Sequence, residues 1–142
     1  MRPVLFDTSI YIRSLRLGDT STLVLRWLNA EAPIWLSGVV LEELYAGAAA
    51  ARAFRVIERL ERDFDRIDRI LVPNLADWTE AGKVLAHLAE KYDYEEIGQG
   101  RLTNDALIAM SASRLAIRVV TANERDFRRL AEFRSFQWEV AP

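Results

Sequence analysis

The chain contains no cysteine, which excludes disulfide bonds, thiolate metal sites and cysteine nucleophiles. No apolar run approaches the roughly 20 residues that span a bilayer, and the first residues lack the basic segment and apolar core of a secretion signal. Its single histidine, His87, lies in a helical run, and no motif places it beside an acidic cluster. We therefore expect a cytoplasmic protein that makes no contact with a membrane and whose chemistry does not depend on cysteine or histidine.

The sequence also lacks an excess of positive charge. It has 21 acidic and 19 basic residues and a formal net charge of −2, so its overall charge does not attract nucleic acid. Any binding of phosphate must therefore be local. All the basic residues except Lys83 and Lys91 are arginines, whose guanidinium groups suit bidentate contacts with phosphate or carboxylate. This bias is compatible with RNA binding or an acidic partner, and equally with a high-GC codon bias.

The 142 residues, 51% of them hydrophobic, suffice for one substantial core, and we interpret residues 1–142 as a single domain. Short β-rich runs alternate with helical periodicity, a pattern typical of an α/β protein whose parallel sheet is covered by helices. Strands are expected at Pro3–Asp7, Ile34–Ser37, Arg69–Val72, Arg118–Thr121 and, more weakly, Gln137–Val140. Helices are expected from Asp19 or Thr20 to Ala30, from an Asn74 cap to about Tyr92, and from a Thr103 or Asn104 cap to about Leu115.

One further helix is expected from an apolar stripe that runs from Ala53 towards Leu71 in steps of three and four residues. Arginines follow the same spacing beside it, at positions 52, 55, 59, 62, 66 and 69. They form either a solvated face, paired as Glu58–Arg62 and Asp65–Arg69, or a basic surface for RNA or an acidic peptide. Exposed ion pairs are common, which favours the solvated face.

Acidic and hydroxyl residues follow the predicted strands. Asp7, with Thr8 and Ser9, comes directly after the apolar run Val4–Phe6, and Thr121 ends another strand. Ligands of an open parallel sheet bind beyond the carboxyl ends of its strands, near the point where strand order reverses. A buried carboxylate such as Asp7 requires a metal ion, a proton or a partner charge. We therefore expect the two strand ends to face one crevice.

The other acidic residues near the predicted site can also be explained by a purely structural role. Glu42 and Glu43 lie in a helix where adjacent residues differ by about 100°, so only one of them can face a shared site, and periodicity alone does not choose. Gly47, one turn later, either leaves room for a ligand or merely weakens an exposed turn. Asp105 could simply complement the dipole of the helix it opens. In the segment 121–127, Thr121 or Asn123 could cap a helix, with Glu124 and Asp126 complementing its dipole.

Taken together, the ordered motifs resemble those of a PIN domain, and specifically of the VapC-type toxins of type II toxin–antitoxin systems. The motifs are Asp7-Thr8-Ser9, Glu43-Leu44-Tyr45-Ala46-Gly47, Asn104-Asp105-Ala106-Leu107-Ile108-Ala109 and Thr121-Ala122-Asn123-Glu124-Arg125-Asp126-Phe127. The resemblance covers nearly the whole chain. It implies a three-layer α/β fold in which helices flank a mostly parallel sheet of four or five strands.

The resemblance also implies a site. Asp7, Glu43 and Asp105 become catalytic residues and the main metal-binding carboxylates, Glu43 being chosen over Glu42 because it immediately precedes the leucine of its motif. Asn123 stands where many PIN domains carry aspartate, and Asp126 is the nearby acid, so both remain candidates for the fourth metal ligand, with Asp126 also catalytic. Thr8, Ser9 and Thr121 are expected to bind substrate.

The activity implied by the resemblance is a ribonuclease that uses Mg2+ or Mn2+. Oxygen ligands suit these hard cations, and the site contains carboxylate, amide and hydroxyl oxygens. An RNA substrate, a cognate antitoxin and a homodimer are the implied partners. The alternatives are a free-standing RNA-processing PIN nuclease and an inactive PIN-fold binding module. A haloacid-dehalogenase-like phosphatase would need an aspartate at Ser9, and a receiver domain would need a lysine after a late strand.

Overall fold

The computed structural model describes residues 2–16, 32–93 and 101–141. The helix expected at 19–30 lies outside these ranges. The described elements, in chain order, are β1 (Val4–Phe6), α1 (Thr8–Arg16), β2 (Ile34–Ser37), α3 (Gly38–Ala46), α4 (Ala51–Arg66), β3 (Ile70–Leu71), α5 (Leu75–Tyr92), α6 (Arg101–Arg114), β4 (Arg118–Thr121), α7 (Glu124–Ala131) and β5 (Trp138–Val140).

The five strands form one parallel sheet in the order β3-β2-β1-β4-β5. The chain builds β1, β2 and β3 towards one edge and then returns to place β4 on the other side of β1, where Phe6 pairs with Val120. Strand order therefore reverses between β1 and β4. The expectation of an α/β fold with a parallel sheet of four or five strands is confirmed.

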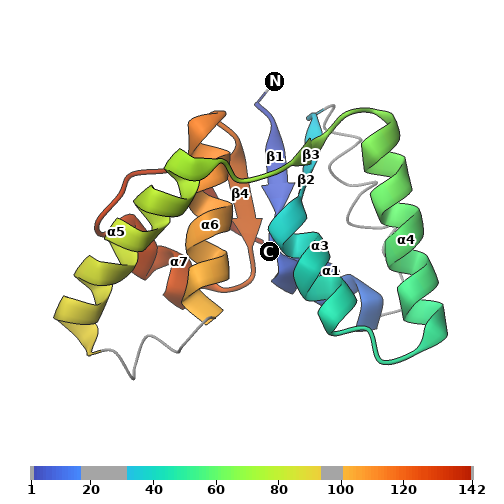
Figure 1. Ribbon diagram of the computed structural model, residues 1–142, viewed down its shortest axis with the longest axis horizontal. Coiled ribbons are helices and arrows are strands. Elements are labelled where there is room, and N and C mark those ends of the chain that lie inside the picture. The colour runs from blue at the N-terminus through green and yellow to red at the C-terminus, as the bar shows by residue number, and fades with distance from the viewer. Residues whose placement is uncertain (1, 17–31, 94–100, 142) are drawn as a thin grey trace.

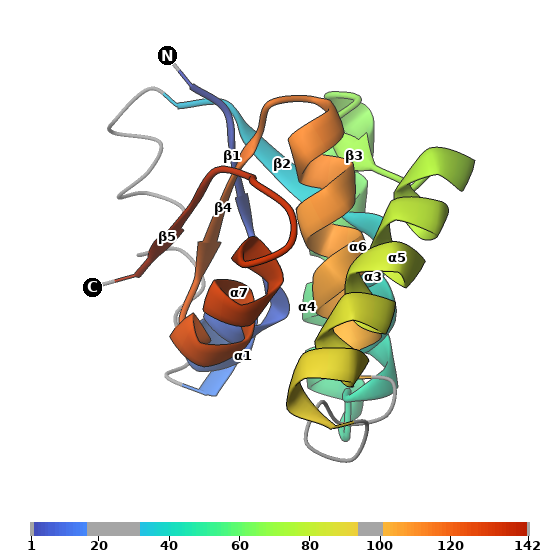
Figure 2. The same ribbon diagram turned by 90° about the vertical axis from the view of Figure 1, so that its left-hand side faces the viewer.

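Helices cover both faces of this sheet, which gives three layers (Figures 1 and 2). Helices α5, α6 and α7 lie on one face, and α1, α3 and α4 lie on the other (Figure 1). Helix α4 packs beside α3 and along β2 and β3, at the edge of the sheet. Within the described part of the chain, no helix has both the length and the apolar character needed to cross a membrane.

The core lies on both sides of β1 and β4, whose apolar side chains are almost completely buried. Helix α6 reaches the sheet closely because its inner face carries small residues, and Ala106, Ala109 and Ala112 are each fully buried. This close approach agrees with the composition of that segment. The same helix, whose second turn contains Asp105, also packs against α3.

Helix α5 begins at the N-cap expected from the sequence, whereas α6 does not. Helix α5 begins after Asn74, whose side chain accepts a hydrogen bond from the Asp77 N–H in a complete capping box. The expected cap of α6 at Thr103 or Asn104 is wrong, because α6 already begins at Arg101. Burial of Leu102, which is 2% exposed, explains the earlier start, since an extra turn places that side chain in the core.

Candidate active site at the ends of strands β1 and β4

Asp7 lies where β1 ends, at the reversal of strand order. Its backbone N–H donates to the carbonyl of Val120 in β4 at 3.0 Å, and its own carbonyl accepts from the N–H of Ile10 in α1 at 3.3 Å. The residue therefore joins the last sheet hydrogen bond to the first turn of a helix. Because its strand neighbours are buried, Asp7 is also buried, with only 2% of its surface exposed.

Two hydroxyl groups hold the Asp7 carboxylate. Ser9 Oγ donates to Oδ1 at 2.5 Å, and Thr121 Oγ1 donates to Oδ2 at 2.6 Å. Burial raises the pKa of Asp7, because desolvation disfavours the charged form, and the hydrogen bonds from Ser9 and Thr121 offset part of that rise. No ion pair to Asp7 is present among the described residues. The carboxylate is thus oriented but not neutralised.

The same two hydroxyls tie together the ends of β1 and β4. Thr121 Oγ1 accepts from the N–H of Asn123 at 2.8 Å, and Ser9 Oγ accepts from the N–H of Ala122 at 3.0 Å. Each oxygen thus donates to Asp7 and accepts from the turn after β4. Thr121 is fully buried, so this geometry favours an orienting role over the substrate contact expected from the sequence. The sequence indicated this arrangement only through a hydroxyl residue at or near the end of each of the two strands.

Glu43 approaches the same strand end through Thr8. Thr8 Oγ1, one residue after Asp7, donates to Glu43 Oε1 at 2.7 Å. Glu43 is half-buried, whereas Glu42 is exposed. Helix α3 begins with the Ser37 hydroxyl accepting from the N–H of Val39 at 3.1 Å, and this start fixes which glutamate faces inward.

Gly47 lies at the end of α3, and its N–H donates to the carbonyl of Glu43 at 3.0 Å. A Cβ at this position would lie 3.4 Å from that carbonyl oxygen, which is ordinary van der Waals contact. Its backbone angle, φ −90°, suits any residue, so neither packing nor backbone conformation requires glycine here. No feature of the described residues gives Gly47 a ligand to accommodate.

Asp105 lies in the second turn of α6, because that helix begins at Arg101. The macrodipole acts mainly within the first turn, so the simple explanation of Asp105 as a dipole-complementing acid is weakened. Asp105 is half-buried, and its helix packs against both α3 and β4. The described contacts therefore link Glu43 to the residue after Asp7, and they place the helix that carries Asp105 against α3 and β4.

The fourth position remains shared between two residues. Asn123 precedes α7 as its N-cap by position, but its side chain makes no capping hydrogen bond. Instead Asn123 Nδ2 donates to Asp126 Oδ2 at 2.8 Å, so the two candidates are joined to each other at the start of α7. Asp126 is half-buried, and Phe127 beside it is fully buried and anchors the helix.

The donors of this site suit a hard cation. Carboxylate, amide and hydroxyl oxygens are the ligands that Mg2+ and Mn2+ prefer. Among the residues that the structure describes, however, no three acidic or histidine side chains converge at metal-binding distance. His87 is not part of the site, since its ring stacks on Phe133 with centroids 5.4 Å apart. The candidate residues therefore fit a hard cation by the chemical type of their donor atoms.

Comparison with known proteins agrees with this architecture. The family model described as PIN domain matches residues 4–133, and the chain belongs to the PIN domain family. PIN domains are nucleases that generally use divalent metal ions. A sequence search among curated proteins found no match.

Solved structures resemble the chain over nearly its whole length. A chain of the DNA-bound VapBC from Salmonella typhimurium aligns with a TM-score of 0.71 and 24% identity, covering 99% of this chain and 98% of that one. VapBC2 from Rickettsia felis, bound to a promoter DNA fragment, aligns at 0.69 and 22%, covering 98% of both chains. VapBC-5 from Mycobacterium tuberculosis aligns at 0.61 and 21%, covering 99% and 98%. These likenesses confirm the three-layer PIN fold expected from the sequence.

Proposed function

We propose that this protein is a VapC-type toxin, a metal-dependent endoribonuclease that cleaves RNA phosphodiester bonds. The observation that carries the proposal is the buried, un-neutralised carboxylate of Asp7, held by two hydroxyls where strand order reverses. A parallel sheet places its ligand site at this position. The proposed site of action is the cytoplasm.

The residues proposed to hold Mg2+ or Mn2+ are Asp7, Glu43 and Asp105, with Asn123 or Asp126 as a fourth ligand. When bound, such an ion activates the attacking water and neutralises charge on the leaving oxygen. The carboxylates are the proposed catalytic groups because they would hold the ion that supplies the activated water. Thr8 and Ser9, both half-buried at the same strand end, are proposed to line the substrate path.

The chain's own contribution is to fix these oxygens in advance. Each carboxylate oxygen of Asp7 accepts a hydrogen bond from one hydroxyl group, which fixes the orientation of the carboxylate. Thr8 orients Glu43 in the same way. A hydroxyl group is neutral, so it can orient a carboxylate without repelling a cation that binds there. An arginine in the same place would repel that cation. Preorganised groups of this kind need not rearrange when the reaction begins.

The direct test is cleavage of total cellular RNA by the purified chain with Mg2+, with Mn2+ or with EDTA. We expect discrete cleavage products with either ion and none in EDTA, because the ion supplies the activated water. Single-stranded DNA of matched sequence serves as the control for substrate class. Equal cleavage in EDTA, or no cleavage with either ion, contradicts the proposal.

We further propose that a cognate antitoxin inhibits the enzyme. The support is the likeness to chains whose structures are described as VapBC toxin–antitoxin complexes. A short reading frame beside the gene would favour the toxin over a free-standing RNA-processing nuclease. Absence of RNA cleavage with RNA binding retained would instead favour an inactive PIN-fold binding module.

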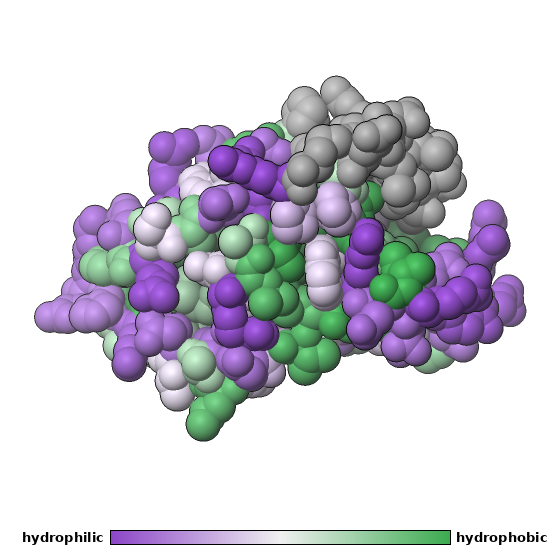
Figure 3. All heavy atoms as spheres, turned by 90° about the horizontal axis from the view of Figure 1, so that it is seen from above, coloured by the Kyte–Doolittle hydropathy of each residue, from purple (hydrophilic) through white to green (hydrophobic). Residues whose placement is uncertain are grey.

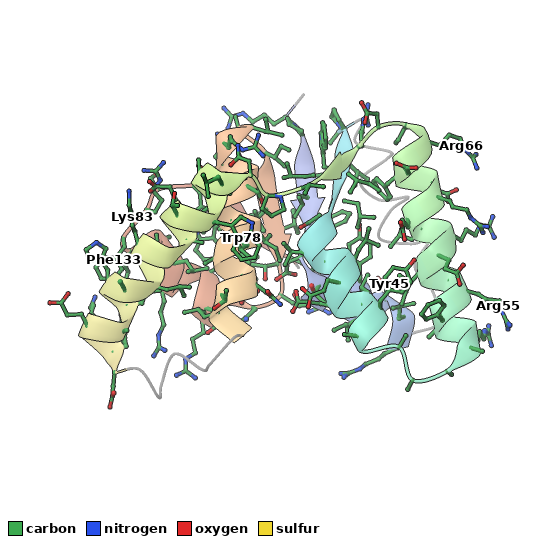
Figure 4. The ribbon with its side chains drawn as sticks, in the orientation of Figure 1. Tyr45, Arg55, Arg66, Trp78, Lys83 and Phe133 are labelled. Atoms are coloured by element: carbon green, nitrogen blue, oxygen red, sulfur yellow. The ribbon has the colours of Figure 1, made fainter. Side chains whose placement is uncertain are left out.

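A homodimer is also proposed, through the first half of α5. Leu75 and Trp78 there are 79% and 54% exposed, and Figure 4 shows Trp78 projecting from α5 across α6. Gly82 lies one turn after Trp78, and nothing lies within 4 Å of where its Cβ would stand. A Trp78 ring from a second copy would have room against this glycine.

We expect Trp78→Glu to convert the dimer into a monomer, because a charged side chain is strongly disfavoured at a desolvated contact. Light scattering coupled to size-exclusion chromatography measures the mass directly. The matched control is Val56→Glu, which places the same charge at an exposed apolar position on α4. A monomeric parent protein, or a dimer that survives Trp78→Glu, would refute this interface.

A further inference from the structure

Helix α4 carries a stripe of arginines that the proposed site does not use. The stripe consists of Arg52, Arg55, Arg59, Arg62 and Arg66, and all five side chains are exposed. In Figure 4 the labelled Arg55 and Arg66 both point away from the body of the molecule. Figure 3 likewise shows hydrophilic side chains over the end of the molecule where α4 lies.

The stripe forms because its residues are separated by three or four positions, which places them along one side of a helix. The opposite side of α4 faces the core, where Ile57 and Phe64 are buried. From Arg52 to Arg66 the line of guanidinium groups extends over roughly 21 Å at 1.5 Å per residue. The arginines therefore present a straight row of positive charges to solvent.

The ion pairs that would make this row an ordinary solvated face are absent. Among the described residues, the expected pairs Glu58–Arg62 and Asp65–Arg69 do not form, and no ion pair involves any arginine of the stripe. Glu61 accepts a hydrogen bond from the Tyr45 hydroxyl at 2.6 Å, on the side of α4 nearer α3. The arginines are thus available to an external anion without breaking internal contacts.

An aromatic platform lies at one end of the stripe. Phe54 is 46% exposed and packs against Tyr45, with ring centroids 5.0 Å apart. Phe54 and Arg55 line a shallow hollow of about 410 Å³ together with the four alanines of 48–51. The hollow is apolar except for Arg55. A flat ring entering it would meet both an aromatic side chain and a guanidinium group.

We propose that the arginine stripe and the Phe54 hollow bind single-stranded RNA outside the catalytic crevice, an inference that rests on the proposed function for the identity of the polyanion. Proteins that bind single strands combine a row of positive charge along the backbone with aromatic side chains that stack bases. Guanidinium groups contact phosphate in a bidentate manner. The combination of a row of guanidinium groups with an exposed aromatic ring beside a hollow favours RNA over an acidic protein, because bases can stack on the ring while phosphates follow the row.

The test measures binding without cleavage, using full-length protein that carries Asp7→Asn as the parent. The probe is a labelled single-stranded RNA of about 16 nucleotides, the upper end of common site sizes. Its affinity is measured from about 50 to 200 mM KCl. The stripe variant combines Arg59→Glu and Arg62→Glu. The matched control combines Lys83→Glu and Arg128→Glu, which change the net charge equally on α5 and α7.

We expect the stripe variant to bind at least about tenfold more weakly and its salt slope to fall by about 1.4, or 0.7 for each lost contact. The control should change by less than about twofold, since its two residues lie on α5 and α7 and not on α4. Phe54→Ala should weaken binding without changing the salt slope, because stacking releases no counterions.

Unchanged affinity in the stripe variant, or an equal loss in the control, would overturn the proposal. So would unchanged RNA binding with loss of binding to polyglutamate, which would assign the stripe to acidic proteins. These outcomes are independent of the cleavage assay. A chain that cleaves RNA but shows no stripe effect refutes only this inference, and a chain that binds through the stripe without cleaving refutes only the nuclease.

Discussion

The Asp7→Asn variant is expected to lose RNA cleavage by about a hundredfold or more while remaining folded. Asparagine has nearly the same shape and can still bond to Ser9 or Thr121, but it has no charge with which to hold a cation. The comparison is the initial rate of cleavage of one RNA by wild type and variant in Mg2+. Circular dichroism establishes that the variant is folded.

Stability should move in the opposite direction to activity. Burial raises the pKa of Asp7 above its ordinary value of 3.8, so in EDTA the folded state binds more protons than the unfolded chain in the interval between the two values. The protonated form of Asp7 contributes its full stabilisation at pH values below the pKa that Asp7 has in the unfolded chain. This contribution is lost as the pH rises through the higher pKa that Asp7 has in the folded protein. At neutral pH the charged carboxylate therefore destabilises the fold.

Denaturant unfolding of both proteins in EDTA, at several pH values from 4 to 7, measures this effect. Relative to Asp7→Asn, the wild type should lose stability as pH rises, and the variant should be at least as stable at pH 7. A variant that is inactive and also much less stable would mean that the loss of activity reports unfolding. A fully active variant would remove Asp7 from the catalytic assignment.

Glu43→Gln is expected to reduce cleavage by about tenfold to a hundredfold, and Glu42→Gln to leave it unchanged. The two glutamates are adjacent, but Glu43 accepts the Thr8 hydroxyl at 2.7 Å, whereas Glu42 is exposed. The pair forms a matched comparison, because the substitution, helix and change in net charge are identical. The measurements are kcat and KM for one RNA at a Mg2+ concentration that just saturates the wild type.

A concentration series of the ion separates a binding defect from a chemical one. If Glu43 holds the ion, excess Mg2+ should restore part of the activity of Glu43→Gln. Equal loss in both variants would show that the charge of α3, and not the position of Glu43, is required. Full activity of Glu43→Gln would leave the Thr8 contact as a structural link between α1 and α3.

Much of the fold could be predicted from local patterns. The strands at Ile34–Ser37 and Arg118–Thr121 have the predicted bounds, because their apolar residues are bordered by clear helix starts. The Asn74 cap is correct since the side chain and its partner lie three residues apart. Asp7 could be placed at a strand end for the same local reason. These features depend on a few consecutive residues.

The details that escaped prediction depend on residues far apart in the chain. Leu102 moves the start of α6 because it reaches the core, and its burial is a property of the assembled domain. The hydrogen bonds from Thr121 and Thr8 to acids of other segments could not be derived from spacing, since they require the relative positions of strands and helices. The choice between Asn123 and Asp126 is of the same kind, because the two side chains bond to each other.

The hydrogen bond between Thr121 and Asp7 joins residues 114 positions apart, and this separation has a consequence for synthesis. A growing chain presents Asp7 early, but β4 leaves the ribosome only after most of the domain has been made. Parallel pairing of distant strands is slow, because the intervening loop must close first. The carboxylate of a nascent chain thus lacks its orienting partner, and an enzyme proposed to destroy RNA would remain harmless to the messenger from which it is being translated.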